Sequence, residues 1–339
     1  MTATNRRILL VSRPRGAAGT DNFRLETAPV PEVGQGQLLV RHHWLSLDPY
    51  MRGRMNDAKS YAPPQPLGEV MIGGTAGEVV ASRHPGFAVG DHVVGMGGWQ
   101  DFALVDERSA PLWRRVDTTQ VPLAAYLGPV GMPGVTAWYG LSMICAPKPG
   151  ETVVVSAASG AVGSVVGQLA KARGCLAVGI AGGPAKCDYV VRELGFDACV
   201  DYKAAPDAAA LDAALAAAAP VGIDACFENV GGRCLDAVIG RMNAFGRIAL
   251  CGLIAGYDGT PVPISNPGPI LRARLKVQGF IIFEHLDIWP WAASELAAAV
   301  ASGRLKYRET IADGLERAPE AFLGLLRGDN LGKQLVRLA

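Results

Sequence analysis

Residues 153–164, VVVSAASGAVGS, decide how this chain folds. The β-branched run ends at small residues and glycines, and VVGQLAKARG then follows with helical spacing. Read from Ala158, the turn is Ala-x-Gly-x-x-Gly, the dinucleotide fingerprint with alanine in place of its first glycine. A strand, a glycine turn and a helix N-terminus bring backbone N–H groups to one point, which suits a pyrophosphate. A tight turn without a ligand is the alternative, and the βαβ order around it favours the nucleotide.

The next strand selects the nucleotide. In an NAD enzyme this strand usually ends with Asp or Glu, which binds the ribose 2′-hydroxyl. The corresponding segment here, GIAGGPAKC at 179–187, has no acidic residue, and its glycines leave room for a larger group. Lys186 supplies a cation that could bind a 2′-phosphate, although a single helical lysine also fits a solvated surface. Together these features predict NADP(H) as the cofactor.

Composition sets the limits for partners and location. Of the 339 residues 50% are hydrophobic and 19% are charged, and the formal net charge is +1. This balance is typical of a folded protein of about two domains, and it gives no support for nucleic acid or a membrane surface as a partner. The apolar run 8–11 is too short for a signal peptide. Seven scattered cysteines indicate reduced thiols, so we expect a cytoplasmic protein.

Three stretches of the chain differ in their pattern of apolar and turn residues. Residues 1–123 contain short alternating runs, such as GGTAGEVVAS, between turn residues, and this pattern predicts a small barrel or sandwich. Residues 124–303 alternate apolar strands with helices, which predicts an α/β domain with a doubly wound parallel sheet. Residues 304–339 end in the strand GKQLVRL, which we expect to rejoin the first domain and make it discontinuous.

A metal site is not expected. Zinc-dependent alcohol chemistry needs Cys and His ligands from the strand-rich domain, but all seven cysteines lie at or beyond Cys145. His42 and His43 are adjacent on a predicted strand, so their side chains would point to opposite faces. They do not form a ligand pair.

A family resemblance covers essentially the whole chain. The segments LSLDPYMRGRM, GMGGWQDFAL, GPVGMPGVTAWYGL, VVVSAASGAVGSVVGQLAK, FENVGG, GRIALCGLIAGY and GDNLGK occur in one order. In this order they resemble the zinc-free medium-chain dehydrogenases/reductases. The most similar branch holds leukotriene B4 dehydrogenase/prostaglandin reductases, plant 2-alkenal reductases and bacterial curcumin reductase. The resemblance implies a GroES-like β-barrel domain joined to a Rossmann domain that binds NADP(H), and usually a homodimer formed through the Rossmann domain.

The resemblance also implies a set of cofactor contacts. Gly160, Ala161 and Val162 match the positions at the pyrophosphate, and Lys186 and Tyr202 match those at the 2′-phosphate. The matching positions beside the ribose and nicotinamide are Asn229, Cys251, Phe280, Ile282 and Asn330, with Thr136 facing the nicotinamide amide. Taken singly, Asn229 also fits a helix cap, Cys251 and Phe280 fit a core, and Asn330 fits a turn.

The implied reaction reduces a carbon–carbon double bond conjugated to a carbonyl group. Hydride from NADPH goes to the β-carbon, and the negative charge on the carbonyl oxygen then needs a hydrogen-bond donor or a proton source. By family position the first candidate is Tyr257 in GLIAGYDG, and the second is Tyr50 in LDPYMR. Relatives commonly carry Asn where this chain has Asp258, and Tyr61 fits either the pocket mouth or a surface loop.

Two other functions stay open at this point. A zinc-free quinone reductase would use the same cofactor site with little need for a tyrosine. A protein that binds NADPH without turnover would need neither tyrosine, whereas both are present. The enone or alkenal reductase is the interpretation that the residues favour.

Overall fold

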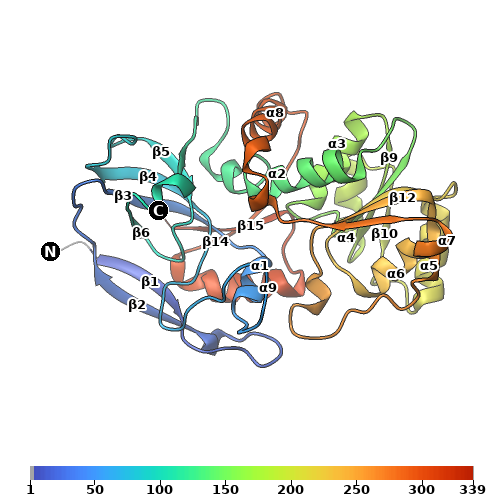
Figure 1. The fold of residues 1–339 in the computed structure, drawn as a ribbon, viewed down its shortest axis with the longest axis horizontal. Coiled ribbons are helices and arrows are strands. Elements are labelled where there is room, and N and C mark those ends of the chain that lie inside the picture. The colour runs from blue at the N-terminus through green and yellow to red at the C-terminus, as the bar shows by residue number, and fades with distance from the viewer. Residues whose placement is uncertain (1–3, 339) are drawn as a thin grey trace. The chain divides into compact units, whose positions relative to one another are not determined.

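The computed structural model describes residues 4–338, and its internal contacts divide the chain into two units (Figure 1). Of the described residues, the first unit comprises 4–127, 309–330 and 334–338, and the second comprises 128–308 and 331–333. The first unit contains two sheets and the second contains one, and each unit has its own apolar core.

The sheet of the second unit has six strands in the order β10-β9-β8-β11-β12-β13, and every neighbouring pair is parallel. The strands are β8 (Thr152–Ser156), β9 (Leu176–Ala181), β10 (Ala198–Asp201), β11 (Ile223–Glu228), β12 (Met242–Leu250) and β13 (Lys276–Gly279). In chain order this is the 3-2-1-4-5-6 arrangement of a Rossmann sheet. The predicted doubly wound parallel sheet is therefore confirmed.

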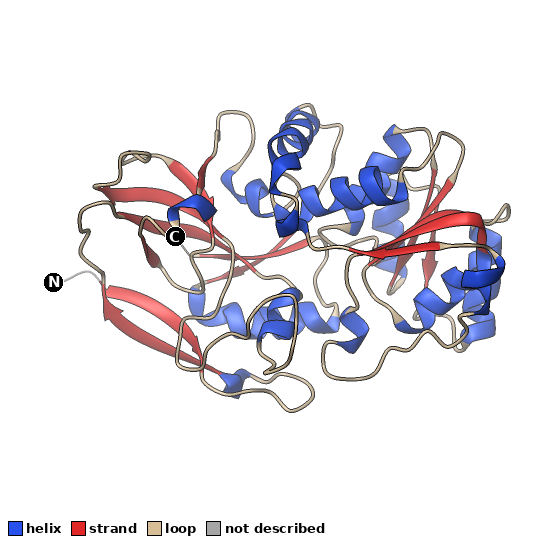
Figure 2. Cartoon of the chain, in the orientation of Figure 1, coloured by secondary structure: helices blue, strands red, loops and turns tan. Residues whose placement is uncertain are grey.

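Different helices cover the two faces of this sheet (Figure 2). One face is covered by α2 (Met132–Tyr139), α3 (Gly163–Ala172) and α8 (Trp289–Ala301). The other is covered by α5 (Ala208–Ala218) and α6 (Gly232–Arg241). Two α-helices are shorter: α4 (Pro184–Asp188) follows β9, and α7 (Gly268–Arg272) precedes β13.

Strand β8 shows why the sequence folds this way. Val153 and Val155 pack in the core on one face of the sheet, and Val154 packs in the core on the other. Successive strand residues point to opposite faces, so a strand covered by helices on both sides needs a continuous apolar run. Helix α5 follows another local rule, because the Asp207 side chain accepts a hydrogen bond from the Ala210 N–H at its N-terminus.

The first unit is built mainly from antiparallel strands. Strands β1 (Thr4–Leu10) and β2 (Phe23–Pro29) form a two-stranded sheet. The larger sheet runs β14-β15-β3-β4-β5-β7, with β6 also paired to β3. Its strands are β3 (Leu38–Ser46), β4 (Thr75–Ser82), β5 (His92–Gly95), β6 (Phe102–Val105), β7 (Arg114–Arg115), β14 (Glu309–Asp313) and β15 (Lys333–Arg337). The α-helices in the described part of this unit are α1 (Tyr50–Arg54) and α9 (Ala318–Arg327).

The core of the first unit contains residues from both ends of the chain. Phe23 stacks on Trp99 at 5.3 Å between ring centroids, and the Phe322 ring of α9 meets Trp99 edge-on at 5.6 Å. Strand β15 pairs antiparallel with β3, where Leu335 lies opposite Ser46. The last strand of the chain thus completes the sheet that the N-terminal part begins.

Between residues 4 and 338, no helix combines the length and the apolar character that crossing a membrane requires.

All seven cysteines have free thiols.

Strand β3 carries a buried histidine that makes stability depend on pH. His42 is 1% exposed, its Nδ1 lies 2.7 Å from the Gln100 carbonyl oxygen, and its ring stacks on Trp113. Burial lowers the pKa of His42 from 6.5 to about 4, although the Gln100 carbonyl partly offsets this. The folded state therefore holds this imidazole neutral at pH values where the unfolded chain binds a proton.

We expect acid to destabilise the protein through this group. Stability from His42 is fully present above pH 6.5 and is lost as the pH falls toward 4. At about 1.4 kcal/mol per pKa unit, the loss is roughly 3 kcal/mol. Urea unfolding between pH 7 and 4.5 should show a flatter pH dependence for His42→Phe, whereas His43→Phe, at the neighbouring half-buried position, should keep most of the wild-type slope. Equal slopes for the wild type and His42→Phe would contradict this assignment.

Candidate active site

Most of the predicted cofactor residues follow the carboxyl ends of strands in the parallel sheet. In a sheet of this order, ligands bind in the crevice outside those ends, near the point where the strand order reverses. The residues at this edge are Gly160, Ala161 and Val162 after β8, Lys186 after β9, Tyr202 after β10, Asn229 after β11, Cys251 after β12, and Phe280 and Ile282 after β13. The fold thus gathers residues that are up to 122 positions apart in the sequence.

The two glycines of the fingerprint turn differ in the space around them, because Gly163 is tightly packed and Gly160 is open. A Cβ added to Gly163 would overlap the Ala157 carbonyl oxygen and lie 2.9 Å from Ala158 Cα, so this glycine lets α3 approach the strand. A Cβ on Gly160 would meet only the Ala157 carbonyl oxygen, at 3.2 Å. No side chain caps the N-terminus of α3, and the first N–H groups of a helix have no partner within the helix. The Gly160, Ser164 and Val165 N–H groups already donate to carbonyl oxygens of the turn, so the backbone donors that the turn offers beside its open glycine face are those of residues 161–163.

The residue in the left-handed region is Ala157, with φ of 49°. Ala158, which replaces the first glycine of the fingerprint, is not among the residues with positive φ, so its substitution causes no backbone strain. Segment 331–333 lies against the same turn, because the Gly332 N–H donates to the Ser159 carbonyl oxygen at 2.9 Å.

At the end of β9 the chain turns through Gly182 and Gly183, the latter with φ of 99°. The Gly183 N–H donates to Asp201 Oδ1 at 2.8 Å, and so does the Lys203 N–H at 3.0 Å. A Cβ on Gly182 would lie 3.1 Å from the Tyr202 hydroxyl oxygen and 3.0 Å from Lys203 Cε. Predicted Tyr202 thus lies against the predicted glycine loop that leads into Lys186.

Sequence reasoning missed two residues beside this loop, Asp201 at the end of β10 and Lys203 just after it. Asp201 holds the loop through backbone N–H groups, and Lys203 adds a second cationic side chain near Gly182. Both flank Tyr202, so a signal was available in the segment VDYK.

A buried carboxylate organises the next strand end. Glu228, the last residue of β11, has no exposed surface, and its Oε1 accepts hydrogen bonds from the Ser156 hydroxyl at 3.0 Å and from the Val230 and Gly231 N–H groups at 2.7 Å. The Asn229 amide nitrogen Nδ2 donates to the Ser156 carbonyl oxygen at 2.8 Å. Burial raises the pKa of Glu228, and the hydrogen bonds that it accepts oppose this rise.

Sequence reasoning also failed to identify Glu228 as a residue of the site. Its signal was an acidic residue inside an apolar run, CFEN, next to the predicted Asn229. A fully buried acid in such a place needs donors around it, and here the strand ends and the following turn provide them.

The predicted donor Tyr257 lies near the end of β12. A Cβ added to Gly252 would be 3.2 Å from the Tyr257 hydroxyl oxygen and 3.4 Å from the Asn229 carbonyl oxygen. Burial raises the pKa of neighbouring Cys251 to about 12, so its thiol stays protonated at neutral pH. The tyrosine hydroxyl and the β11 and β12 strand ends therefore share one part of the sheet edge.

Three other predicted residues have clear packing roles. The Phe280 ring meets Phe227 edge-on at 6.1 Å, and both Phe280 and Ile282 belong to the core beside α2. The Thr136 hydroxyl donates to the Met132 carbonyl oxygen at 2.7 Å within α2.

Tyr50, Tyr61 and Asn330 belong to the first unit. Tyr50 begins α1, and burial, reinforced by the charge of Asp48, raises its pKa above the usual range. Its hydroxyl therefore stays protonated and can donate a hydrogen bond. Tyr61 is 53% exposed, with the Arg54 guanidinium 5.0 Å from its ring centroid. Asn330 is buried, at 9% exposure.

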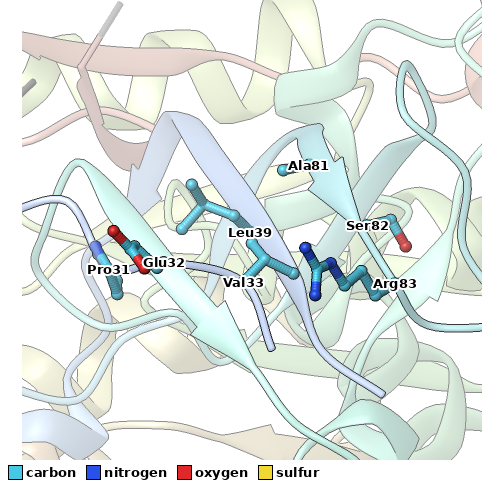
Figure 3. A pocket seen from close by; sticks show the side chains of 7 residues that line it. All are labelled: Pro31, Glu32, Val33, Leu39, Ala81, Ser82 and Arg83. Atoms are coloured by element: carbon cyan, nitrogen blue, oxygen red, sulfur yellow. The ribbon is translucent and has the colours of Figure 1, made fainter. Parts of the chain in front are cut away.

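Within residues 4–338, no cluster of three or more His, Cys, Asp or Glu side chains could hold a metal ion. None of the residues predicted above lines the surface pocket of the first unit (Figure 3). It is lined by Pro31, Glu32, Val33, Leu39, Ala81, Ser82 and Arg83.

Comparisons with known proteins match both units. Residues 6–111 match a family model described as the N-terminal domain of oxidoreductase, and residues 161–298 match one described as zinc-binding dehydrogenase. With the parallel sheet and the separate β-rich unit, these matches confirm the predicted fold class, a Rossmann domain joined to a domain of the GroES-like type.

Individual relatives cover nearly the whole chain. The NADPH-dependent curcumin reductase of Escherichia coli is 46% identical over 99% of this chain and 97% of its own length. The NADP(+)-dependent 2-alkenal reductase of Nicotiana tabacum is 40% identical over 91% of this chain and 89% of its own. Among solved structures, CurA from Vibrio vulnificus in complex with NADPH has a TM-score of 0.92 at 45% identity, covering 98% of this chain and 99% of its own.

Proposed function

Because this chain belongs to the medium-chain dehydrogenase/reductase family, in the branch that holds curcumin, 2-alkenal and prostaglandin reductases, we propose that it reduces conjugated carbon–carbon double bonds with NADPH. The substrates are α,β-unsaturated ketones and aldehydes, and the reaction needs no metal. The observation that carries the proposal is the Tyr257 hydroxyl beside Gly252, at the same sheet edge as the fingerprint turn.

The residues of the second unit fit an NADP-type dinucleotide. The open face of Gly160 and the uncapped N-terminus of α3 suit the pyrophosphate. Beyond β9, Lys186, Lys203 and Tyr202 supply cations and a hydroxyl for the 2′-phosphate. Asp201, the last residue of β10, accepts the Gly183 and Lys203 N–H groups, so its carboxylate is already engaged in holding the loop after β9.

NADPH, when bound, would supply a hydride for the β-carbon of the substrate double bond. Negative charge then develops on the carbonyl oxygen, and a proton adds to the α-carbon. The Tyr257 hydroxyl donates a hydrogen bond to that oxygen and is the first candidate for the proton source. Tyr50, whose hydroxyl stays protonated, is the second candidate donor.

The function is tested by following NADPH oxidation with 3-nonen-2-one and with menadione. Turnover of the enone to the saturated ketone, identified by mass spectrometry, is the expected result. Turnover of menadione alone would make the protein a quinone reductase. NADPH binding without turnover of either compound would support a protein that binds the cofactor and does no chemistry.

Coenzyme preference should depend on Lys186. We expect Lys186→Ala to raise the Kd for NADPH about tenfold, because it removes a charge-assisted hydrogen bond to the 2′-phosphate. The Kd for NADH, which lacks that phosphate, should change little. Both values can be measured by fluorescence titration. Lys171→Ala is the matched control, because Lys171 pairs with Asp197 at 2.7 Å and has no proposed cofactor role. An equal loss for both nucleotides would contradict the assignment.

We also propose that the protein is a homodimer formed through its Rossmann domain. Strand β13 lies at one edge of the six-stranded sheet, and Val277 on it is 38% exposed. An edge strand of this kind can pair with its copy across a two-fold axis. Sedimentation equilibrium should give twice the chain mass of 35.5 kDa; a mass equal to one chain would refute the dimer.

A further inference from the structure

Glu228 is a buried acid without a role in the chemistry proposed above. It ends β11, has no exposed surface, and uses one oxygen, Oε1, to accept three hydrogen bonds. Its backbone carbonyl oxygen accepts two more, from the Cys251 N–H at 2.9 Å and the Gly252 N–H at 3.2 Å. One residue therefore ties together the carboxyl ends of β8, β11 and β12, because Ser156 ends β8.

The side chain of Glu228 also determines what the Ser156 hydroxyl can do. A serine hydroxyl has a single proton, and here it is donated to Glu228 Oε1 at 3.0 Å. The Ser156 oxygen is thereby oriented to accept the Asn229 N–H at 2.7 Å. The Asn229 side chain then donates to the Ser156 carbonyl oxygen at 2.8 Å. The chain of hydrogen bonds runs from Asn229 through Ser156 to Glu228.

The same oxygen holds the turn that follows. The N–H groups of Val230 and Gly231 both donate to Glu228 Oε1 at 2.7 Å, and Gly231 and Gly232 have φ of 81° and 57°. No side chain at the N-cap position performs this task for α6, because that position is Gly231. The turn 229–232 thus depends on an acceptor that comes from the preceding strand.

We propose that Glu228 is a positioning residue for the nicotinamide half of the cofactor, holding Asn229 and the turn 229–232 through Ser156 and the backbone. The inference rests on the proposed function, since Asn229 is one of the positions assigned beside the ribose and nicotinamide. The inference predicts that Glu228 affects binding of the nicotinamide half of NADPH and not of the adenosine 2′-phosphate half, because the latter is assigned to the loops after β9 and β10.

The test compares two ligands, NADPH and adenosine 2′,5′-bisphosphate, which lacks the nicotinamide half. Titration of Glu228→Leu should show NADPH bound about tenfold more weakly or worse, as expected when Asn229 is no longer held in place and its hydrogen bond to the nicotinamide half is lost, with the bisphosphate bound as in the wild type. Glu228→Gln keeps an acceptor oxygen of the same shape and should restore most of the NADPH affinity. Ser156→Ala, which removes the middle link without unburying an acid, should repeat the selective loss.

Controls separate this role from a general loss of folding. Cys226→Ala removes the thiol 3.8 Å from the other Glu228 oxygen and should leave both affinities unchanged. In an Asn229→Ala background, Glu228→Leu should cost little further NADPH affinity, since both act on one contact. Equal weakening of both ligands in Glu228→Leu and Ser156→Ala, or no weakening of either, would overturn the inference. Wild-type protein that bound the bisphosphate but not NADPH, or neither, would overturn the proposed function and this inference together.

Discussion

Replacing Tyr257 by phenylalanine should lower kcat for an enone about a hundredfold, with a much smaller change in KM. Charge on the carbonyl oxygen is greatest after hydride addition begins, so a hydroxyl donor there stabilises the transition state more than the bound substrate. The substitution should therefore lower kcat much more than it changes KM. The position of the hydroxyl, beside Gly252 and near the Asn229 carbonyl oxygen, is the structural basis for this expectation.

Steady-state kinetics with 3-nonen-2-one would measure the effect, and NADPH titration would check that cofactor binding is intact. Tyr189→Phe is a matched control from the same unit, because the Tyr189 hydroxyl is buried without a hydrogen-bond partner and its removal should leave kcat unchanged. Tyr50→Phe should have a smaller effect than Tyr257→Phe. A Tyr257→Phe enzyme with wild-type kcat would show that another group stabilises the oxygen.

The two glycines of the fingerprint should fail in different ways when replaced by alanine. At Gly163 a methyl group would overlap the Ala157 carbonyl oxygen, and every close neighbour is backbone that cannot turn aside. We expect Gly163→Ala to lower the free energy of unfolding by about 3 kcal/mol, which is the upper range for overpacking. Denaturant unfolding and thermal melting of the protein without ligand would measure this loss.

Gly160→Ala is the matched partner of that variant. Its methyl group would meet one atom at 3.2 Å, so the protein alone should keep nearly wild-type stability. The same methyl group would occupy the face assigned to the pyrophosphate, and the Kd for NADPH should rise tenfold or more, at about 1.4 kcal/mol per tenfold. A stable Gly163→Ala protein, or a Gly160→Ala protein that binds NADPH normally, would contradict the roles given to these glycines.

Local patterns predicted the Rossmann half of the fold because each pattern reports on its own element. The valine run at 153–155 could be recognised as a strand buried on both faces, and the glycines after it as the start of a helix. Alternation of such units leaves few topologies, since parallel crossovers are nearly always right-handed. The strand order β10-β9-β8-β11-β12-β13 is one of the topologies that this rule allows.

The residues that hold the candidate site together could not be found in this way. Asp201 and Glu228 act on neighbours that local spacing does not identify, namely the Gly183 N–H, the Ser156 hydroxyl and the Cys251 N–H. Nor does spacing reveal that Ala157, rather than a glycine, takes the left-handed conformation in the fingerprint turn.

The sequence by itself therefore determined the fold class, the family and, through the missing acid after β9, the expected choice of NADP over NAD. Each depends on residues that are neighbours along one strand, turn or helix, or on the order of such segments. Only the tertiary structure decided which side chains meet at the carboxyl edge of the sheet. Contacts such as Glu228 with Ser156 join strand ends 72 residues apart, and they exist only when packing of the two sheet faces has aligned those ends.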